Sequence, residues 1–273
     1  MLSKLLKHEF RDTARIIPFF YLIVLILSGL VFSSRQLEIS WFRATFSVLL
    51  ILFGIATVII TFALVVMRFY RNLYSNEGYL MFTLPVKPGL LLASKLITAY
   101  IWVIVSYLIA FGSICISLYG LGVSKSDMQE IFAQIREYGL QKVIYAIIPI
   151  FLLVTLYLLS QIFFSITFAN RPFLHNFGIG GAFLVFIATY AVLEIVQALF
   201  TIFVPFSVVV DLVNNVNVTV ANKNMFNFIV ENVRGSIPTD FVIGLGGYIF
   251  VAVMTFVLLF MTIDMMKRKV SIK

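Results

Sequence analysis

Six long apolar runs separated by polar connectors set the pattern of the chain. The runs cover residues 16–33, 46–67, 96–120, 143–169, 177–204 and 241–263. Each is near or above the roughly 18 residues that an α-helix needs to cross the hydrocarbon core of a bilayer. The pattern therefore predicts an all-α polytopic membrane protein with six transmembrane helices.

An amphipathic stretch precedes the first run. Apolar residues recur at near-helical spacing, whereas the basic residues of this stretch occupy the other faces; the apolar residues are Leu2, Leu5, Leu6, Phe10 and Ile17. This predicts an N-terminal interfacial helix on the inner leaflet, with its bases toward anionic headgroups. The alternative is a basic tail that only orients the chain. Pro18 then predicts a bend into the first crossing.

Composition excludes a soluble protein. Apolar residues make up 62% of the chain, charged residues 12%, and the mean hydropathy is +1.06. A soluble domain of this length could not bury that much apolar surface. The formal charge of +8 would suggest nucleic acid in a soluble protein, but here it predicts a lipid membrane as partner and no nucleic acid.

The basic residues give an orientation. Across six crossings, 13 of the 20 lysines and arginines fall on the side that holds both termini, and 7 on the other side. The side richer in Lys and Arg faces the cytoplasm. The expected location is therefore the cell membrane, multi-pass, with both termini cytoplasmic.

The connectors on the outer side differ from one another. Residues 123–142 mix charges with apolar residues at helical spacing, which predicts a short amphipathic helix at the outer interface. The longest outer connector, residues 205–240, interleaves asparagines with valines. Its pattern predicts no particular structure.

The inner connector between the second and third runs is long, basic and aromatic, and reads RFYRNLYSNEGYLMFTLPVKPGLLLASK over residues 68–95. A turn would need far fewer residues. Its apolar spacing predicts a short cytoplasmic helix that ends before Pro85, and Pro88 suits the first turn of the helix that follows.

Two stretches resemble a known family. The run EGYLMFTLPVK, residues 77–87, with Lys95 further on, is similar to the first cytoplasmic loop of permeases of ABC exporters of the second type. The opening LSKLLKHEFRDTARI resembles the amphipathic start of small permeases in that group. The resemblance implies a single transmembrane permease domain over residues 1–273.

In that family the first loop is a coupling helix that docks on a separate ATPase subunit. The resemblance implies that the coupling residues are Glu77, Gly78, Tyr79, Met81, Phe82, Leu84 and Pro85. Tyr79, Met81 and Phe82 would form the docking face, and Glu77 would either make a polar contact or orient the helix. The alternative is that Glu77 and Gly78 form a plain loop and that Pro85 only ends a helix.

The implied function is the membrane-spanning permease subunit of an ATP-driven ABC exporter for a hydrophobic or amphipathic substrate, such as an antimicrobial peptide, a lipid or a drug. It would form a homodimer, or a heterodimer with a related permease. The sequence has no GxxxxGK[ST] loop, so the chain is expected to be no enzyme and to hold no cofactor, with ATP and Mg bound by the partner ATPase. The alternative is a non-transporting membrane sensor or scaffold subunit.

Polar residues inside the runs are further candidates. Glu194 lies in the middle of the fifth run, with Gln197 one helical turn later and Gln161 in the fourth run. An acid at membrane depth is costly without a partner or water. These three residues predict either a substrate path or hydrogen bonding between helices, with Gln161 as a possible partner of Glu194 in either role.

Catalytic and metal chemistry find little support. His8 and His175 have no Cys, Asp or Glu cluster at metal-ligand spacing, so no metal site is expected. Ser106, Ser113 and Ser165 have no histidine partner at membrane depth, which favours a role in helix packing. No catalytic residues are predicted.

Overall fold

The computed structural model describes residues 1–36, 40–74, 86–137, 139–171, 177–211, 217–233 and 240–267. The chain divides into two compact units, Met1–Gln129 and Glu130–Ser271. Each unit is described by itself. The single permease domain expected from the resemblance stays a prediction.

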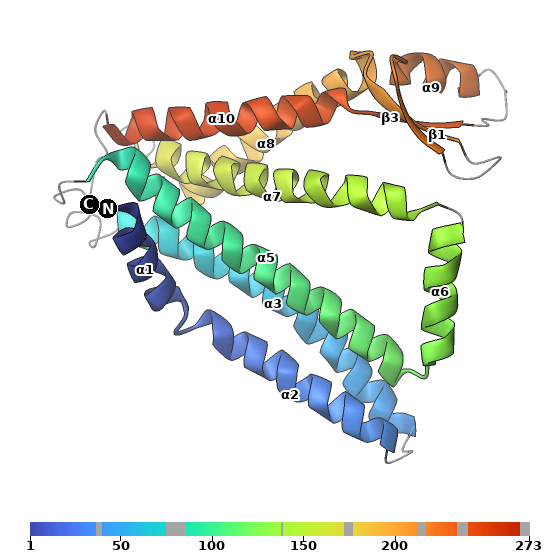
Figure 1. Ribbon diagram of the computed structural model, residues 1–273. Helices are drawn as coiled ribbons and strands as arrows, with labels where there is room; N and C mark the ends of the chain where they lie inside the picture. Colours follow the sequence, from blue (N-terminus) through green and yellow to red (C-terminus); the bar gives the residue numbers. More distant parts are fainter. Residues whose placement is uncertain are drawn as a thin grey trace. The chain divides into compact units, whose positions relative to one another are not determined.

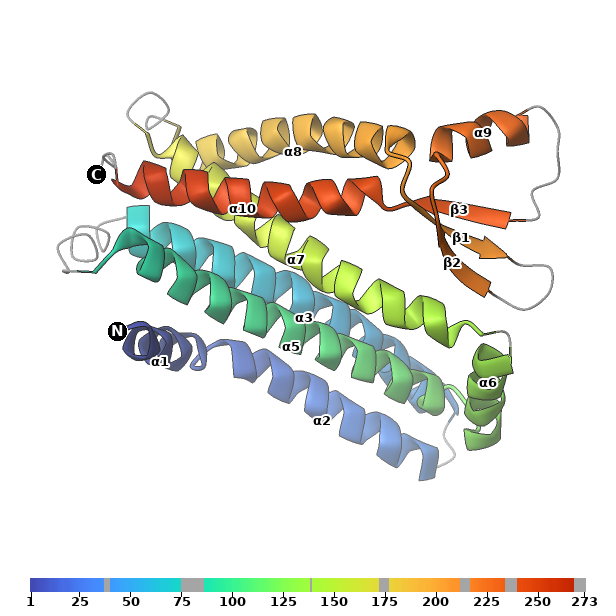
Figure 2. The same cartoon turned by 45° about the horizontal axis from the view of Figure 1, so that its top comes forward.

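The first unit is helical. It contains α1 (Leu2–Thr13), α2 (Ile17–Gln36), α3 (Ser40–Tyr74) and α5 (Pro88–Gly120), and it ends within α6 (Lys125–Glu137). Figures 1 and 2 show α3 and α5 side by side along their length, with α2 against this pair and α1 beside one end of it.

Local sequence explains where these helices begin and end. Pro88 occupies the first helical turn of α5, where a residue without an N–H group loses no hydrogen bond. The bend that the sequence predicts at Pro18 lies just before it, between Thr13 and Ile17, and Pro18 itself is in the first turn of α2. The amphipathic helix expected over residues 123–142 is present as α6.

Hydroxyl groups connect the three long helices of the first unit. The Tyr21 hydroxyl of α2 lies 2.8 Å from Ser106 Oγ of α5, and Ser106 Oγ donates to Thr61 Oγ1 of α3 at 2.8 Å. Ser113 of α5 packs directly against Gly54 of α3, where the Cβ of any larger residue would collide with the Ser113 hydroxyl. The packing role expected for Ser106 and Ser113 is confirmed.

The second unit holds the other three long helices and a small sheet. Its elements are α7 (Gln141–Ala169), α8 (Gly178–Phe203), β1 (Ser207–Asp211), β2 (Asn217–Ala221), α9 (Met225–Val233), β3 (Asp240–Gly244) and α10 (Gly246–Lys267). Figure 1 shows α9 and the strands beyond one end of α8 and α10. Both α7 and α8 pack against α10.

Two kinds of contact hold this unit together. Tyr157 and Phe164 of α7 form a buried cluster with apolar residues of α10, among them Leu258. Gly246 and Gly247 open α10 directly against α8, where a side chain on either would collide with it. These glycines let the two helices approach closely.

The sheet gives structure to a connector for which the sequence predicts none, and it corrects the start of the sixth long helix. Its order is β2-β1-β3, all antiparallel, and Val209 pairs with both Thr219 and Val242. The outer connector, for which the sequence predicts no structure, thus supplies β1 and β2. The sixth apolar run, expected from residue 241, begins as β3, and α10 starts only at Gly246, because glycines disfavour a helix there and β1 offers a pairing partner.

Among the described residues, six helices are long and apolar enough to span a membrane, namely α2, α3, α5, α7, α8 and α10. The prediction of an all-α polytopic membrane protein is confirmed, with one small sheet in the described chain. Two helices continue beyond their apolar runs. The extension of α3 past Met67 carries Arg68 and Arg71, and α5 begins before its run, so that Lys95 is helical.

Candidate functional site

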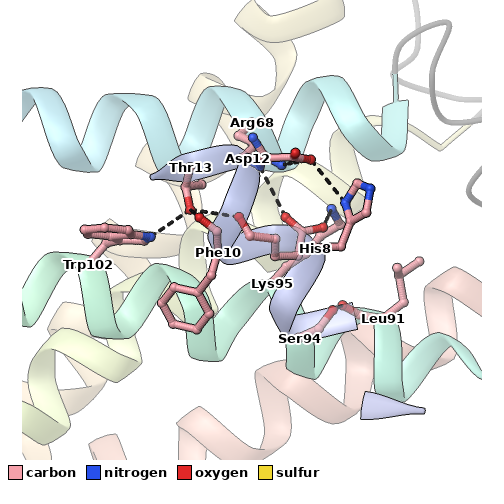
Figure 3. Close-up of polar contacts among 10 residues, drawn as sticks. His8, Phe10, Asp12, Thr13, Arg68, Leu91, Ser94, Lys95 and Trp102 are labelled. Atoms are coloured by element: carbon pink, nitrogen blue, oxygen red, sulfur yellow. Dashed lines mark hydrogen bonds and ion pairs between the residues drawn. The ribbon is translucent and has the colours of Figure 1, made fainter. Parts of the chain in front are cut away.

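Four charged side chains meet where α1 packs on the long helices of the first unit. Lys95 Nζ of α5 donates to Glu9 Oε1 of α1 at 2.6 Å, and Arg68 Nε of α3 donates to Glu9 Oε2 at 3.2 Å. Arg68 Nη2 also donates to Asp12 Oδ2 at 2.9 Å. We call Glu9, Asp12, Arg68 and Lys95 the α1 ion cluster. Figure 3 shows these contacts reaching α1 from two different helices.

The sequence of α1 explains how an acid comes to lie in this contact. The half-buried Leu2, Leu5 and Leu6 form one stripe of the helix, and Glu9 and Thr13 continue that stripe at the same spacing. The bases of α1, such as Lys7 and Arg11, are exposed on its other faces, as the sequence predicts. Glu9 is therefore directed toward α3 and α5.

The central pair of the cluster is buried. The side chain of Glu9 is 7% exposed and that of Lys95 is 4% exposed. Burying two charges costs several kcal/mol for each ion, and only close pairing with further hydrogen bonds offsets this cost. Glu9 meets that condition, because each of its oxygens accepts a bond from a different cation.

A second contact lies beside the ion cluster. Trp102 Nε1 of α5 donates to Thr13 Oγ1 at 2.7 Å, and Thr13 Oγ1 donates to the Glu9 carbonyl at 2.8 Å. The rings of Phe10 and Trp102 lie 6.1 Å apart between their centroids. The C-terminal half of α1 is thus attached to α5 by polar and aromatic contacts together (Figure 3).

The outer part of the cluster is weaker. His8 Nδ1 lies 3.1 Å from Asp12 Oδ2, but the His8 side chain is 71% exposed. Exposed ion pairs contribute little to stability because water screens them. The His8–Asp12 contact therefore adds little to the stability of the fold.

The contacts of this site connect helices. It holds no nucleophile with a positioned base, and the described residues contain no group of three or more His, Cys, Asp or Glu side chains that could hold a metal ion. What it does provide is a direct connection of α1 to both α3 and α5, close to the ends that flank residues 75–87.

The residues expected to couple to an ATPase, from Glu77 to Pro85, lie outside the described residues, as does His175. Their role stays a prediction. The elements that border them, α3 ending at Tyr74 and α5 beginning at Pro88, are described.

The three intramembrane candidates are not brought together by hydrogen bonds. Glu194 is exposed on α8, and Gln197 is half-buried with its side chain close to Gly247 of α10. Gln161 is completely buried on α7, and neither its amide nitrogen nor its amide oxygen has a hydrogen-bond partner in the described part of the chain. The suggested bond between Gln161 and Glu194 is therefore not formed there, and a substrate path through these residues stays a prediction.

A groove of about 510 Å³ lies between α2 and α5. Its walls are mostly aliphatic, such as Leu22, Leu25 and Ile109, and its polar groups are hydroxyls, among them Tyr21 and Ser28. None of the described residues that line it is charged. Such a surface suits an apolar chain better than a charged molecule.

Sequence reasoning counted Arg68 and Lys95 as cytoplasmic charges but missed Glu9 and Asp12. The sequence does contain a feature that indicates the role of Glu9. Glu9 is an acid on the apolar stripe of an otherwise basic amphipathic helix, a position where a charge needs a partner.

Comparison with protein-family models found no match to the chain, and comparisons with curated proteins and with solved structures found none either.

Proposed function

We propose that this chain is the membrane-spanning permease subunit of an ATP-driven exporter of the ABC class, energised by a separate ATPase subunit. The proposal rests on the resemblance of residues 77–87 to a coupling loop, together with the surroundings of that segment. ATP and Mg would be bound by the partner.

The observation that carries the proposal is the position of the α1 ion cluster. Glu9 pairs with Arg68, close to the end of α3, and with Lys95, close to the start of α5. These are the two helices joined by the proposed coupling segment. A displacement of that segment by an ATPase would therefore act on α3, α5 and α1 together.

The cluster favours movement of this end of the first unit as one body. Parting α1 from either long helix would leave a buried charge without its partner, which is costly. Because α2 follows α1 after a short bend, the displacement would also reach α2. Rigid-body motion of this kind is one of the common ways in which an energy source switches access to a site.

The remaining assignments follow from the same proposal. The chain would form a homodimer, or a heterodimer with a related permease, in the cell membrane, with both termini in the cytoplasm as the distribution of Lys and Arg favours. The groove between α2 and α5, whose described lining residues carry no charge, supports a hydrophobic or amphipathic substrate.

The proposal is tested by recovering the chain from the membrane and identifying bound proteins. Tyr79→Ala with Phe82→Ala should abolish recovery of an ATPase. The matched control is Phe132→Ala with Tyr145→Ala, two exposed aromatic residues expected on the outer side. Recovery of an ATPase that is the same for both double variants would contradict the proposed coupling site.

A second experiment separates a transporter from a sensor or scaffold. Glu194→Gln removes the charge of the one carboxylate of α8 without changing its size. In a reconstituted complex, a transporter that uses this residue should show altered ATP hydrolysis on addition of substrate. A scaffold subunit should give the same ATP hydrolysis with either residue.

A further inference from the structure

Glu194 of α8 is the only charged residue in the six apolar runs of the sequence. No lysine or arginine of these runs can therefore neutralise it. Tyr157 of α7 interacts electrostatically with Glu194, but it is buried and supplies no positive charge. An acid at this depth is costly unless a hydrogen-bonding partner or water satisfies it.

The carboxyl group lies on the side of α8 that is turned away from the rest of the second unit. On the packed side, Thr189 Oγ1 lies 3.4 Å from Ser165 Oγ of α7, and Leu193 packs against the buried cluster of α7 and α10. An α-helix has about 3.6 residues per turn, so residues three and four apart share a face. Four exposed residues follow this spacing on the opposite side of α8, namely Ile187, Ala191, Glu194 and Ala198. We call them the Glu194 face.

The neighbours of Glu194 on this face leave room for another helix. Ala191 precedes Glu194 by about one helical turn, and Ala198 follows it by about one turn. Residues as small as alanine let the backbone of a second membrane helix come close, within reach of a polar side chain between them. Lipid tails offer Glu194 no hydrogen bond, so this face calls for a protein partner.

A second copy of the chain meets the requirements of this face. All copies of a membrane protein have the same orientation in the bilayer, so a two-fold axis along the membrane normal brings the Glu194 side chains of two copies to the same depth. Two carboxyl groups can hydrogen-bond to each other once at least one of them holds a proton, because the protonated group donates and the oxygens of the other accept. The pair therefore needs no cation, and the apolar runs contain none.

We propose that the Glu194 face of α8 is the interface between two copies of this chain, with the two Glu194 side chains hydrogen-bonded to each other and the alanines packed around them. The interface deepens the proposed function, on which it rests only for the presence of a dimer. It assigns the dimer partner to a second copy of the chain.

Disulfide formation tests which side of α8 meets the second copy. Single cysteines are introduced in the Cys115→Ser background, and the purified chain is oxidised in dilute phosphatidylcholine vesicles without any ATPase. Ala191→Cys and Ala198→Cys should form disulfide-linked dimers. The controls Val192→Cys and Leu199→Cys lie one residue further along α8, at nearly the same depth but on another exposed side, and should give several-fold less dimer. Equal yields on both sides would overturn the interface.

Two replacements of Glu194 test the hydrogen bond itself. The dissociation constant of the dimer is measured by energy transfer between donor-labelled and acceptor-labelled chains at falling protein-to-lipid ratios. Glu194→Leu, which suits a membrane helix, should raise this constant about three- to thirtyfold, the range for a hydrogen bond between membrane helices. Glu194→Gln still donates and accepts, so it should change the constant by less than about threefold. A Glu194→Leu dimer as tight as the original would refute the pairing.

The outcomes separate this interface from the proposed coupling to an ATPase. Recovery of an ATPase with the chain, but no dimer linked through Ala191→Cys or Ala198→Cys, would overturn the interface and leave the coupling site standing. A linked dimer of a chain that recovers no ATPase would support the interface alone. Cross-linking of Ala191→Cys in the native membrane to a different protein, with no linked homodimer, would overturn the second copy as the partner.

Discussion

Removing the Glu9 charge tests whether the α1 ion cluster holds α1 in place. Glu9→Gln leaves a side chain of nearly the same size, but Lys95, only 4% exposed, loses the carboxylate to which it donates at 2.6 Å. Breaking a buried ion pair from one side costs about 3–5 kcal/mol. Because α1 is a short helix separated from α2 by a bend, we expect this cost to appear as local opening of α1.

The magnitude converts directly into an exchange rate. Each 1.4 kcal/mol is a factor of ten in an equilibrium constant. The amides of Leu2–Thr13 should therefore exchange with solvent about 100- to 4000-fold faster in Glu9→Gln, up to the rate of an unprotected peptide. Hydrogen exchange measured by mass spectrometry on the purified protein gives this rate.

A double variant identifies the cause. Glu9→Gln combined with Lys95→Met contains no unpaired buried charge, and apolar replacements of buried pairs are often neutral. Protection of α1 should return to within about tenfold of the original chain. The control Glu130→Gln, at an exposed position on α6, should change nothing. The reasoning is refuted if Glu9→Gln changes exchange by less than about threefold, or if the double variant is no better protected than the single one.

Two further predictions concern packing between membrane helices. Gly247→Ala should lower the unfolding temperature of the purified protein, because its Cβ would collide with α8, whereas Gly180→Ala, which meets open space, should leave that temperature unchanged or raise it. Ser106→Ala should destabilise the first unit by about 1–3 kcal/mol in denaturant titration, because it removes the shared hydrogen-bond partner of Tyr21 and Thr61; an unaltered midpoint would mean that water or another group replaces Ser106.

The sequence predicts the helical part of the fold because a chain in lipid must satisfy its backbone hydrogen bonds within each segment. Hydropathy therefore suffices to predict the six crossings. Local chemistry also predicts some helix ends, as Pro88 does for α5. The same reasoning does not apply to the sheet, because β1 pairs with β3 across residues far apart in the chain, such as Val209 and Val242.

The α1 ion cluster could not be predicted from the sequence either, because its members are far apart along the chain. Glu9 and Lys95 are 86 residues apart, and nothing local to either specifies the other. The apolar stripe of α1 indicates that Glu9 needs a partner, but only the packing of α1 on α3 and α5 selects Arg68 and Lys95. Conversely, the residues singled out by family resemblance, from Glu77 to Pro85, lie outside the described chain and stay predictions.

The most direct test of the proposed function is a cross-link from the connector to its partner. Cys115 is the single cysteine of the chain, so Cys115→Ser gives a background in which Tyr79→Cys can carry a cross-linker in the native membrane. We predict that the product contains a P-loop ATPase, and that Phe132→Cys, on the side expected to face away from the cytoplasm, yields none. A Tyr79→Cys chain that cross-links to no ATPase, while a Phe132→Cys chain does, would contradict the account.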